Sequence, residues 1–174
     1  MKRNSTFLGT LFAFAVLLFA TGNVAQGQAR GETLGDLSRD WTLRTGVFIA
    51  TSDATRKAIG TVGFSGTVER KVYRTDSYDL FLGMGYHGMD RVYNVPIMFN
   101  LVYHTNSLHY GGGFGYSFGK RLDGRGFAAP TLSINAGLRV RNGKNPLDVD
   151  VRYFFVSGSN QELDGLSLTL GIAF

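Results

Sequence analysis

The sequence predicts an all-β protein, a transmembrane antiparallel up-and-down β-barrel of about eight strands, preceded by a signal peptide. Two observations carry this prediction. From Trp41 onward, apolar and polar residues alternate with a period of two in about eight segments, and no segment shows a sustained helical repeat. Glycine is close to twice its usual share of about 7 %, at 24 of 174 residues, and many of these glycines share the polar face of the segments.

The first 29 residues predict a secretory signal. Lys2 and Arg3 form a charged start, and the apolar run 7–20 is too short to span a bilayer as a helix. Small residues then offer cleavage after Ala25 or after Ala29. We therefore assign 1–29 to the signal peptide, 30–40 to a polar lead-in and 41–174 to the barrel. The alternative for the first segment is an uncleaved anchor helix.

Composition excludes several classes of protein. Charged residues make up 18 % and apolar residues 44 %, which argues against disorder. Removal of Lys2 and Arg3 leaves 16 basic and 13 acidic residues, and the basic ones form no cluster of the kind that nucleic acid requires. The chain has no cysteine, so a disulfide cannot stabilise it, whereas a closed barrel in lipid would be stable without one.

The alternating segments have the length of nine or more residues that a tilted membrane strand needs. They run near 41–50, 58–73, 78–89, 95–104, 109–118, 131–141, 147–155 and 166–174. The connections at 74–77, 104–109 and 141–146 are short, while those near 119–130 and 157–165 are longer. Short periplasmic turns and longer outer loops are usual in such barrels, so we expect the barrel to begin at the periplasmic side.

Each segment has a bulky apolar face and a face of glycine and polar residues. A soluble, lipocalin-like barrel would place the apolar face inside, around a ligand. The lumen of an eight-stranded barrel is narrow, however, and glycine on a water-facing strand would only weaken it. We therefore expect the glycine face inside and the bulky face against lipid. Two aromatic girdles should follow, one of Trp41, Tyr78, Tyr103, Tyr110 and Phe174, the other of Tyr86, Tyr116 and Tyr153.

Charged residues of the inward face are expected to form a polar network in the lumen. Residues about equally distant from a short turn lie side by side, which sets Lys71 across from Asp79. The same geometry sets two arginines near two aspartates at the 141–146 turn. A nearly neutral, poorly conducting lumen follows, and the alternative is a hydrated lumen with solvated charges. The network comprises Arg44, Glu69, Lys71, Asp79, Arg139, Arg141, Asp148, Asp150 and Arg152.

Two stretches, VPIMFNLVYHTNSLHYGGGFGYSFG (95–119) and LSLTLGIAF (166–174), carry a family resemblance. The first resembles the central hairpin, and the second the C-terminal strand, of the small outer-membrane barrels of the OmpA-transmembrane-domain, OmpX and OmpW-like class. The resemblance implies an outer-membrane location among lipid and lipopolysaccharide. It also implies that Phe174 is a signal for the barrel-assembly machinery. Members differ widely in role, so function does not follow from the fold. The oligomeric state stays open.

We expect no enzyme activity, no cofactor and no metal site. The HTNS string at 104–107 is similar to a deacylase His–Ser pair, but its spacing departs from that family, and no acidic residue is obviously placed to orient His104. His87, His104 and His109 share the inward parity without metal-ligand spacing. Three functions remain open, in this order: a structural, envelope-stabilising or surface-interaction barrel, a narrow conduit for small apolar solutes, and a lipid-modifying enzyme.

Overall fold

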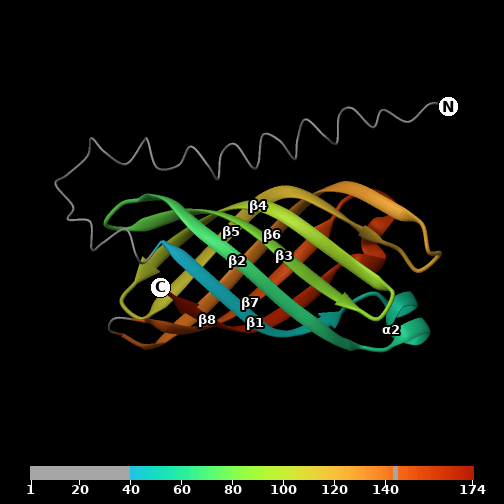
Figure 1. Cartoon of the computed structure of the whole chain (residues 1–174), viewed down its shortest axis with the longest axis horizontal. Coiled ribbons are helices and arrows are strands. Elements are labelled where there is room, and N and C mark those ends of the chain that lie inside the picture. The colour runs from blue at the N-terminus through green and yellow to red at the C-terminus, as the bar shows by residue number, and fades with distance from the viewer. Residues whose placement is uncertain (1–39, 143–144) are drawn as a thin grey trace. The chain divides into compact units, whose positions relative to one another are not determined.

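The computed structural model describes residues 40–142 and 145–174, which form a closed barrel of eight antiparallel strands (Figure 1). Each strand pairs with its neighbours in sequence, and β1 also pairs with β8. The predicted fold class is confirmed. The expected signal peptide at 1–29 lies outside the described residues. The strands are β1 (Trp41–Ala50), β2 (Val62–Arg74), β3 (Tyr78–Met89), β4 (Val92–Thr105), β5 (Leu108–Lys120), β6 (Gly126–Arg141), β7 (Leu147–Val156) and β8 (Gly165–Ala173).

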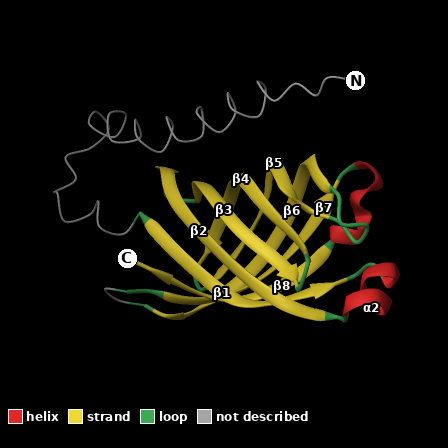
Figure 2. Ribbon diagram, turned by 45° about the vertical axis from the view of Figure 1, so that its right-hand side comes forward, coloured by secondary structure: helices red, strands yellow, loops and turns green. Residues whose placement is uncertain are grey.

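The two ends of the barrel differ. One end, which we call the helical end, carries α2 (Asp53–Ile59) between β1 and β2 and the 3₁₀ helix η3 (Gly158–Leu163) between β7 and β8 (Figure 2). The other, the turn end, carries the connections after β2, β4 and β6, together with the start of β1 and the end of β8. Within the described ranges, no helix is long and apolar enough to cross a membrane.

Two expected boundaries at the helical end are wrong. Residues 53–59, partly assigned to a strand, form α2, which ends at Gly60 with a φ of 113° that favours glycine. A helix of only seven residues is too short to show a clear 3.6-residue repeat. The long loop expected at 119–130 is a turn of residues 121–125, because β5 runs on to Lys120 and β6 begins at Gly126.

The outward face is apolar between two aromatic rows, as the alternation predicts. At the turn end, the rings of Tyr73, Tyr78, Tyr103 and Tyr110 contact one another in sequence, with centroids 5.7–6.1 Å apart. At the helical end, the ring of Tyr86 contacts Phe64 and Tyr93. The exposed large side chains between these rows include Leu43, Val68, Met84, Phe114, Leu132, Ile134, Leu168 and Leu170. Such a belt between aromatic girdles is typical of a barrel embedded in lipid.

Inward-facing glycines make room for long side chains on the neighbouring strands. Gly83 is paired with Glu69, and Gly171 with Arg44. A Cβ added to Gly83 would lie 2.9 Å from Glu69 Cγ, and one added to Gly171 would lie 2.6 Å from Arg44 Nη1. Both distances are too short for a real Cβ, so the glycines and the long polar side chains require each other. At three other glycines, a neighbouring side chain likewise lies too close for an added Cβ: Asn100 at Gly113, His109 at Gly137 and Phe48 at Gly165.

Apolar side chains fill the barrel mouth at the helical end, a feature that the sequence analysis did not predict. Residues from α2, η3 and the β5–β6 turn pack onto inward-facing residues of the strands. Their burial removes these apolar side chains from water at this mouth. We call this group the apolar lid, and it consists of Phe48, Ala50, Ile59, Met89, Val92, Leu122, Phe127, Ala129, Val156 and Leu163.

Hydrogen bonds connect the segments that contribute to the lid, namely α2, η3 and the β5–β6 turn. Thr55 Oγ1 of α2 donates a hydrogen bond to the Glu162 carbonyl of η3 at 2.6 Å. Arg121 of the β5–β6 turn donates to Glu162 Oε1, also at 2.6 Å. Asp164, which follows η3, accepts a hydrogen bond from the Val156 N–H at 2.7 Å. Three connections that are distant in sequence are therefore held together above the lumen.

Asp164 gives the lid a dependence on pH. Burial raises the pKa of its carboxyl above the ordinary value, although the hydrogen bond from Val156 favours the charged form. The folded protein therefore binds this proton more tightly than the unfolded chain does. The stabilisation from the proton is present at low pH and is lost as the pH rises through the folded pKa.

Candidate functional site

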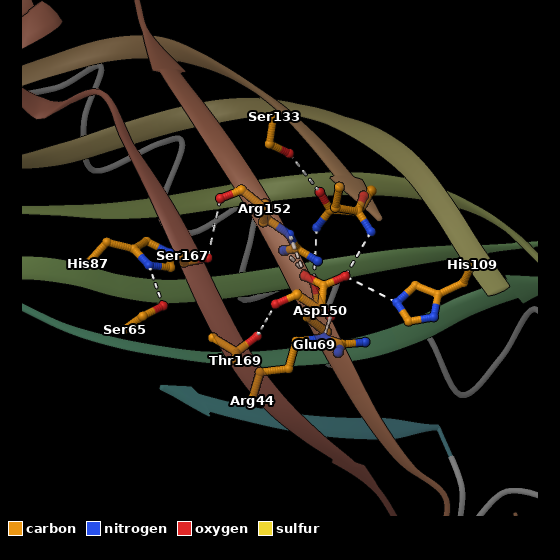
Figure 3. A network of polar contacts seen from close by, with 12 residues as sticks. Arg44, Ser65, Glu69, His87, His109, Ser133, Asp150, Arg152, Ser167 and Thr169 are labelled. Carbon is orange, nitrogen blue, oxygen red and sulfur yellow. Dashed lines mark hydrogen bonds and ion pairs between the residues drawn. The ribbon is translucent and has the colours of Figure 1, made fainter. Parts of the chain in front are cut away.

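The candidate site is the polar network in the middle of the lumen, and its centre is Glu69 (Figure 3). Glu69 Oε2 accepts a hydrogen bond from Arg44 Nε of β1 at 2.9 Å. Its Oε1 accepts from Arg152 Nη1 of β7 at 2.8 Å and from Asn100 Nδ2 of β4 at 3.1 Å. Only about 1 % of Glu69 is exposed. A single buried carboxylate thus links β1, β2, β4 and β7 across the lumen.

A second carboxylate, Asp150 of β7, extends the network toward β5 and β6. Its Oδ2 lies 3.1 Å from both His109 Nε2 and Asn135 Nδ2. Its Oδ1 lies 3.7 Å from Arg152 Nε, so Arg152 stands between the two acidic centres. Both centres are buried, and each ion in such a place costs several kcal/mol of desolvation that its partners must offset. The hydrogen bonds and ion pairs among these side chains offset part of that desolvation cost, so the charged groups can remain buried in the lumen.

A third cluster, around Asp79, lies near the turn end. Lys71 Nζ is 2.7 Å from Asp79 Oδ2, so the two side chains meet as expected. They are not directly opposite, however, because a register shift after Lys71 sets Lys71 opposite Phe81 and Asp79 opposite Arg74. His104 Nε2 also contacts Asp79 Oδ2, at 3.2 Å, and Arg74 Nε lies 3.5 Å from Oδ1. The expectation that no acidic residue orients His104 is therefore wrong. β2 and β3 supply the lysine and the aspartate, while His104 comes from β4.

The expected placement of Arg139 and Arg141 near Asp148 and Asp150 is confirmed for Arg139 and Asp148, which are opposite each other, and is wrong for Arg141. The register of β6 shifts between the two arginines, so that Arg139 is opposite Asp148 but Arg141 is opposite Leu147. This one-residue irregularity turns Arg141 away from the lumen, and both arginines are exposed at the turn end. Asp148 instead forms an ion pair with Arg44. Strict alternation cannot predict such a bulge, because the hydrophobic pattern continues through it.

The network is balanced in charge, although its members differ from those predicted. Arg44, Lys71 and Arg152 remain in the lumen, and Arg74 joins them at the rim. The acids are Glu69, Asp79, Asp148 and Asp150, so each sign contributes four residues. Asn100, Asn135, His104 and His109 also join the network. The alternation places these four on the inward face, but their partners are not their register partners, so only the three-dimensional structure reveals them.

A smaller polar level lies between the Glu69 centre and the apolar lid. Ser65 Oγ and His87 Nδ1 are 2.8 Å apart, and the ring of His87 packs against Phe154 with centroids 4.2 Å apart. His87 is opposite Asn94 on β4. All four residues are buried. From the turn end to the helical end, the lumen therefore contains the charged centres, the level of Ser65 and His87, and the apolar lid. The apolar side chains of Phe81, Met98 and Val102 are buried beside the charged centres.

Solved structures similar to this chain include transmembrane and outer-membrane barrels, all at low sequence identity. No family model matches the chain, and no curated protein sequence matches it. A designed transmembrane β-barrel is 15 % identical, with a TM-score of 0.49 over 77 % of this chain and 94 % of its own. The outer-membrane protein Ail of Yersinia pestis is 14 % identical, with a TM-score of 0.49 over 78 % and 99 %. The outer-membrane protein AlkL is 18 % identical, with a TM-score of 0.43 over 86 % and 96 %.

The fold is a closed antiparallel barrel of eight strands. The resemblance inferred from 95–119 and 166–174 is confirmed for this fold, and the outer-membrane location that it implies stays a prediction. Both stretches lie in the wall, the first across β4 and β5 and the second in β8. Identities of 14–18 % extend no further than the fold, so any role must be argued from the lumen, the lid and the outward surface.

The Arg44–Asp148 pair can be separated from its neighbours with a double-mutant cycle. We expect Arg44→Ala and Asp148→Ala to show a coupling energy of about 1–3 kcal/mol, because the two side chains are in direct contact in the lumen. The measurement is urea unfolding in detergent or lipid. Arg139→Ala with Asp148→Ala is the comparison cycle and should show weaker coupling, of about 0.2–1 kcal/mol, because Arg139 is opposite Asp148 but is exposed. Equal coupling in the two cycles would contradict the assigned partners.

Phe174 is expected to act in assembly. It is exposed, and its backbone N–H and C=O exchange hydrogen bonds with Trp41, at 2.9 and 3.2 Å, where the barrel closes. Phe174→Lys should lower the amount of folded protein in the outer membrane and leave export unchanged. The readout is the fast-migrating band in unheated gels, compared with the periplasmic fraction. Normal assembly of the variant would refute this role.

Proposed function

We propose that the protein is an integral outer-membrane barrel with a closed lumen and a structural, envelope-stabilising or surface-interaction role. The observation that carries the proposal is the Glu69 centre, which ties four strands together across the lumen. The apolar lid is a second group of side chains that would obstruct the same lumen, at its helical end. Charged side chains that are already paired with one another offer a solute few partners, and their separation would cost several kcal/mol.

The location in the outer membrane is supported by the outward face. Its apolar belt lies between two aromatic rows and would be costly to expose to water. In the proposed orientation, the helical end faces outward and the turn end faces the periplasm, since the turn-end connections are short. The partners of such a protein would be outer-membrane lipid and lipopolysaccharide, and the assembly machinery during insertion.

Conductance in planar bilayers tests the closed lumen. We expect the wild-type barrel to insert without producing stable single-channel currents. Glu69→Ala combined with Leu163→Ser should weaken the Glu69 centre and the lid together and yield measurable currents. Asp53→Ala with Lys57→Ala, on the exposed part of α2, is the control and should remain silent. Steady currents from the wild type would refute the closed lumen.

A conduit for small apolar solutes is the second candidate, and the lid is the feature that favours it. An apolar solute could enter among Ile59, Leu122 and Phe127 at an energetic advantage. Passage along the axis would then require it to cross the Glu69 and Asp150 centres, which bind no apolar group well. Uptake of a small alkane into liposomes that contain the protein, without uptake into empty ones, would select this function.

Catalysis is not part of the proposal. Ser65 and His87 are in hydrogen-bond contact, but both are buried beneath the lid. Ser107, the serine of the 104–107 string, lies in an exposed turn, and His104 is paired with Asp79. A nucleophile must be within reach of both its base and its substrate. Hydrolysis of lipid A by the purified barrel would overturn this assignment.

A further inference from the structure

Two segments of the apolar lid, α2 and η3, are helical flaps whose bases are fixed to the barrel wall (Figure 2). At the base of α2, the Ala50 N–H donates a hydrogen bond to the Thr61 carbonyl at 3.0 Å. At the base of η3, the Thr51 N–H donates to the Asp164 carbonyl at 3.2 Å. The helices lie beyond these bases and take no part in the strand ladders. A movement of either flap would therefore leave the wall unchanged.

Each flap has a glycine with a positive φ at one of its ends. Gly60 follows α2 with a φ of 113°, and Gly158 begins η3 with a φ of 77°. Because glycine has no Cβ, its backbone can rotate through regions that other residues rarely enter. The hinges of mobile loops are a few positions at the ends of such elements. The two glycines are thus placed where a small rotation would move a whole helix.

The apolar contacts that hold the flaps down are few. α2 contributes Ile59 to the lid, and η3 contributes Leu163. Leu163 is buried, whereas Ile59 is only partly buried. Segments with few buried apolar contacts open locally much more readily than the core of a protein does. Hydrogen bonds between the flaps therefore have a large influence on how often they open.

Two of these hydrogen bonds end on Glu162 of η3. Its carbonyl accepts from Thr55 Oγ1 of α2, and its Oε1 accepts from Arg121 Nε of the β5–β6 turn, each at 2.6 Å. The side chains of Arg121 and Glu162 are 28 % and 15 % exposed, so water reaches their ion pair. One residue at the water-facing side of the lid thus joins η3 both to α2 and to the β5–β6 turn.

We propose that the two flaps form a gate at the helical mouth and that Glu162 is the latch that holds it closed. The inference rests on the proposed function, in which this mouth is closed. When the latch is released, the flaps rotate outward about Gly60 and Gly158, and the level of Ser65 becomes accessible to water. The Glu69 centre lies deeper in the lumen and stays in place. The gate therefore gives access to the helical half of the lumen and opens no channel across the membrane.

A thiol placed beneath the lid reports the opening of the gate. The chain has no cysteine, so Ser65→Cys supplies a single thiol at a position that is fully buried. The measurement is the rate at which a small, charged, water-soluble thiol reagent labels this parent barrel in lipid. The fast-migrating band in unheated gels shows that each variant is folded before it is labelled.

Thr55→Val with Glu162→Ala, added to the parent, removes both hydrogen bonds of the latch. We expect this variant to be labelled about tenfold faster than the parent, since hydrogen bonds to charged groups shift a local equilibrium by about that factor. Arg121→Gln, which removes only the partner of the Glu162 carboxylate, should be labelled at an intermediate rate. Asp53→Ala with Lys57→Ala, on the exposed part of α2, is the matched control and should keep the rate of the parent.

The labelling rates separate the failure of this inference from the failure of the proposed function. Rapid labelling of the parent itself would contradict the closed lumen. Slow labelling of the parent, with no acceleration in either latch variant, would contradict only the gate. Equal acceleration in the latch variants and in the control would also overturn the latch, because any change to the lid would then suffice.

Discussion

Glu69→Ala should lower the free energy of unfolding by about 3–5 kcal/mol, the usual cost of removing one partner from a buried ion pair. Arg44, Arg152 and Asn100 would each lose a hydrogen-bond acceptor at once. Two guanidinium groups would then be left close together in the lumen without the carboxylate that joins them. The measurement is urea unfolding of the reconstituted barrel, followed by the fluorescence of Trp41, the one tryptophan of the chain.

Asp53→Ala is the matched control for this loss of a carboxylate. Asp53 forms an ion pair with Arg56 on the exposed surface of α2, where such pairs contribute about 0–1 kcal/mol. Glu69→Gln should lie between the two variants, because the amide keeps an acceptor oxygen but loses the charge. A Glu69→Ala barrel as stable as the Asp53→Ala barrel would show that water solvates the lumen charges.

Gly83→Leu is expected to prevent most of the chain from reaching the folded state. Gly83 is opposite Glu69, whose Cγ would be only 2.9 Å from an added Cβ. Overpacking alone costs about 1–3 kcal/mol, and displacement of Glu69 would add the loss of its ion pairs. The readout is the fraction of fast-migrating, folded barrel in unheated gels after refolding into lipid.

The control for Gly83→Leu is the outward-facing Gly112→Leu, which adds an apolar side chain where lipid can accommodate it. This variant should fold to nearly the same extent as the wild type. Similar yields from the two variants would show that the lumen has spare room, and the link between glycines and long polar side chains would then fail.

Much of the fold could be predicted from the sequence because the wall of a barrel repeats a simple rule. Alternation separates the two faces, and a short turn brings the residues that flank it near one another, which is why the Lys71–Asp79 ion pair could be predicted although a bulge shifts the register there. The rule failed where the backbone departs from it. The register shift between Arg139 and Arg141 is one such place, and its residues show no break in the hydrophobic pattern.

The contacts across the lumen could not be predicted by the same means. Arg152 reaches Glu69 although their strands are not neighbours, and no spacing along the chain encodes that distance. The lid was missed for a related reason. α2, η3 and the β5–β6 turn each contribute a single apolar residue, Ile59, Leu163 and Leu122, so none of these segments shows a pattern by itself. Phe48 and Phe154 are also buried on the inward face. The sequence analysis did not identify them as inward-facing, because the residues next to them in the sequence are apolar too.

The pairing of β1 with β8 has a kinetic consequence. Thr42 is opposite Ala173, so the contact that closes the wall joins residues more than a hundred positions apart. A chain that still lacks β8 leaves β1 with an open edge, and open edges pair readily with other chains. Contacts between residues so far apart in the sequence also form slowly, because the chain between them must first lose conformational entropy as its ends come together. We therefore expect closure of this seam to be the slowest step of folding, and the interval before it to be when the chain is most prone to aggregate.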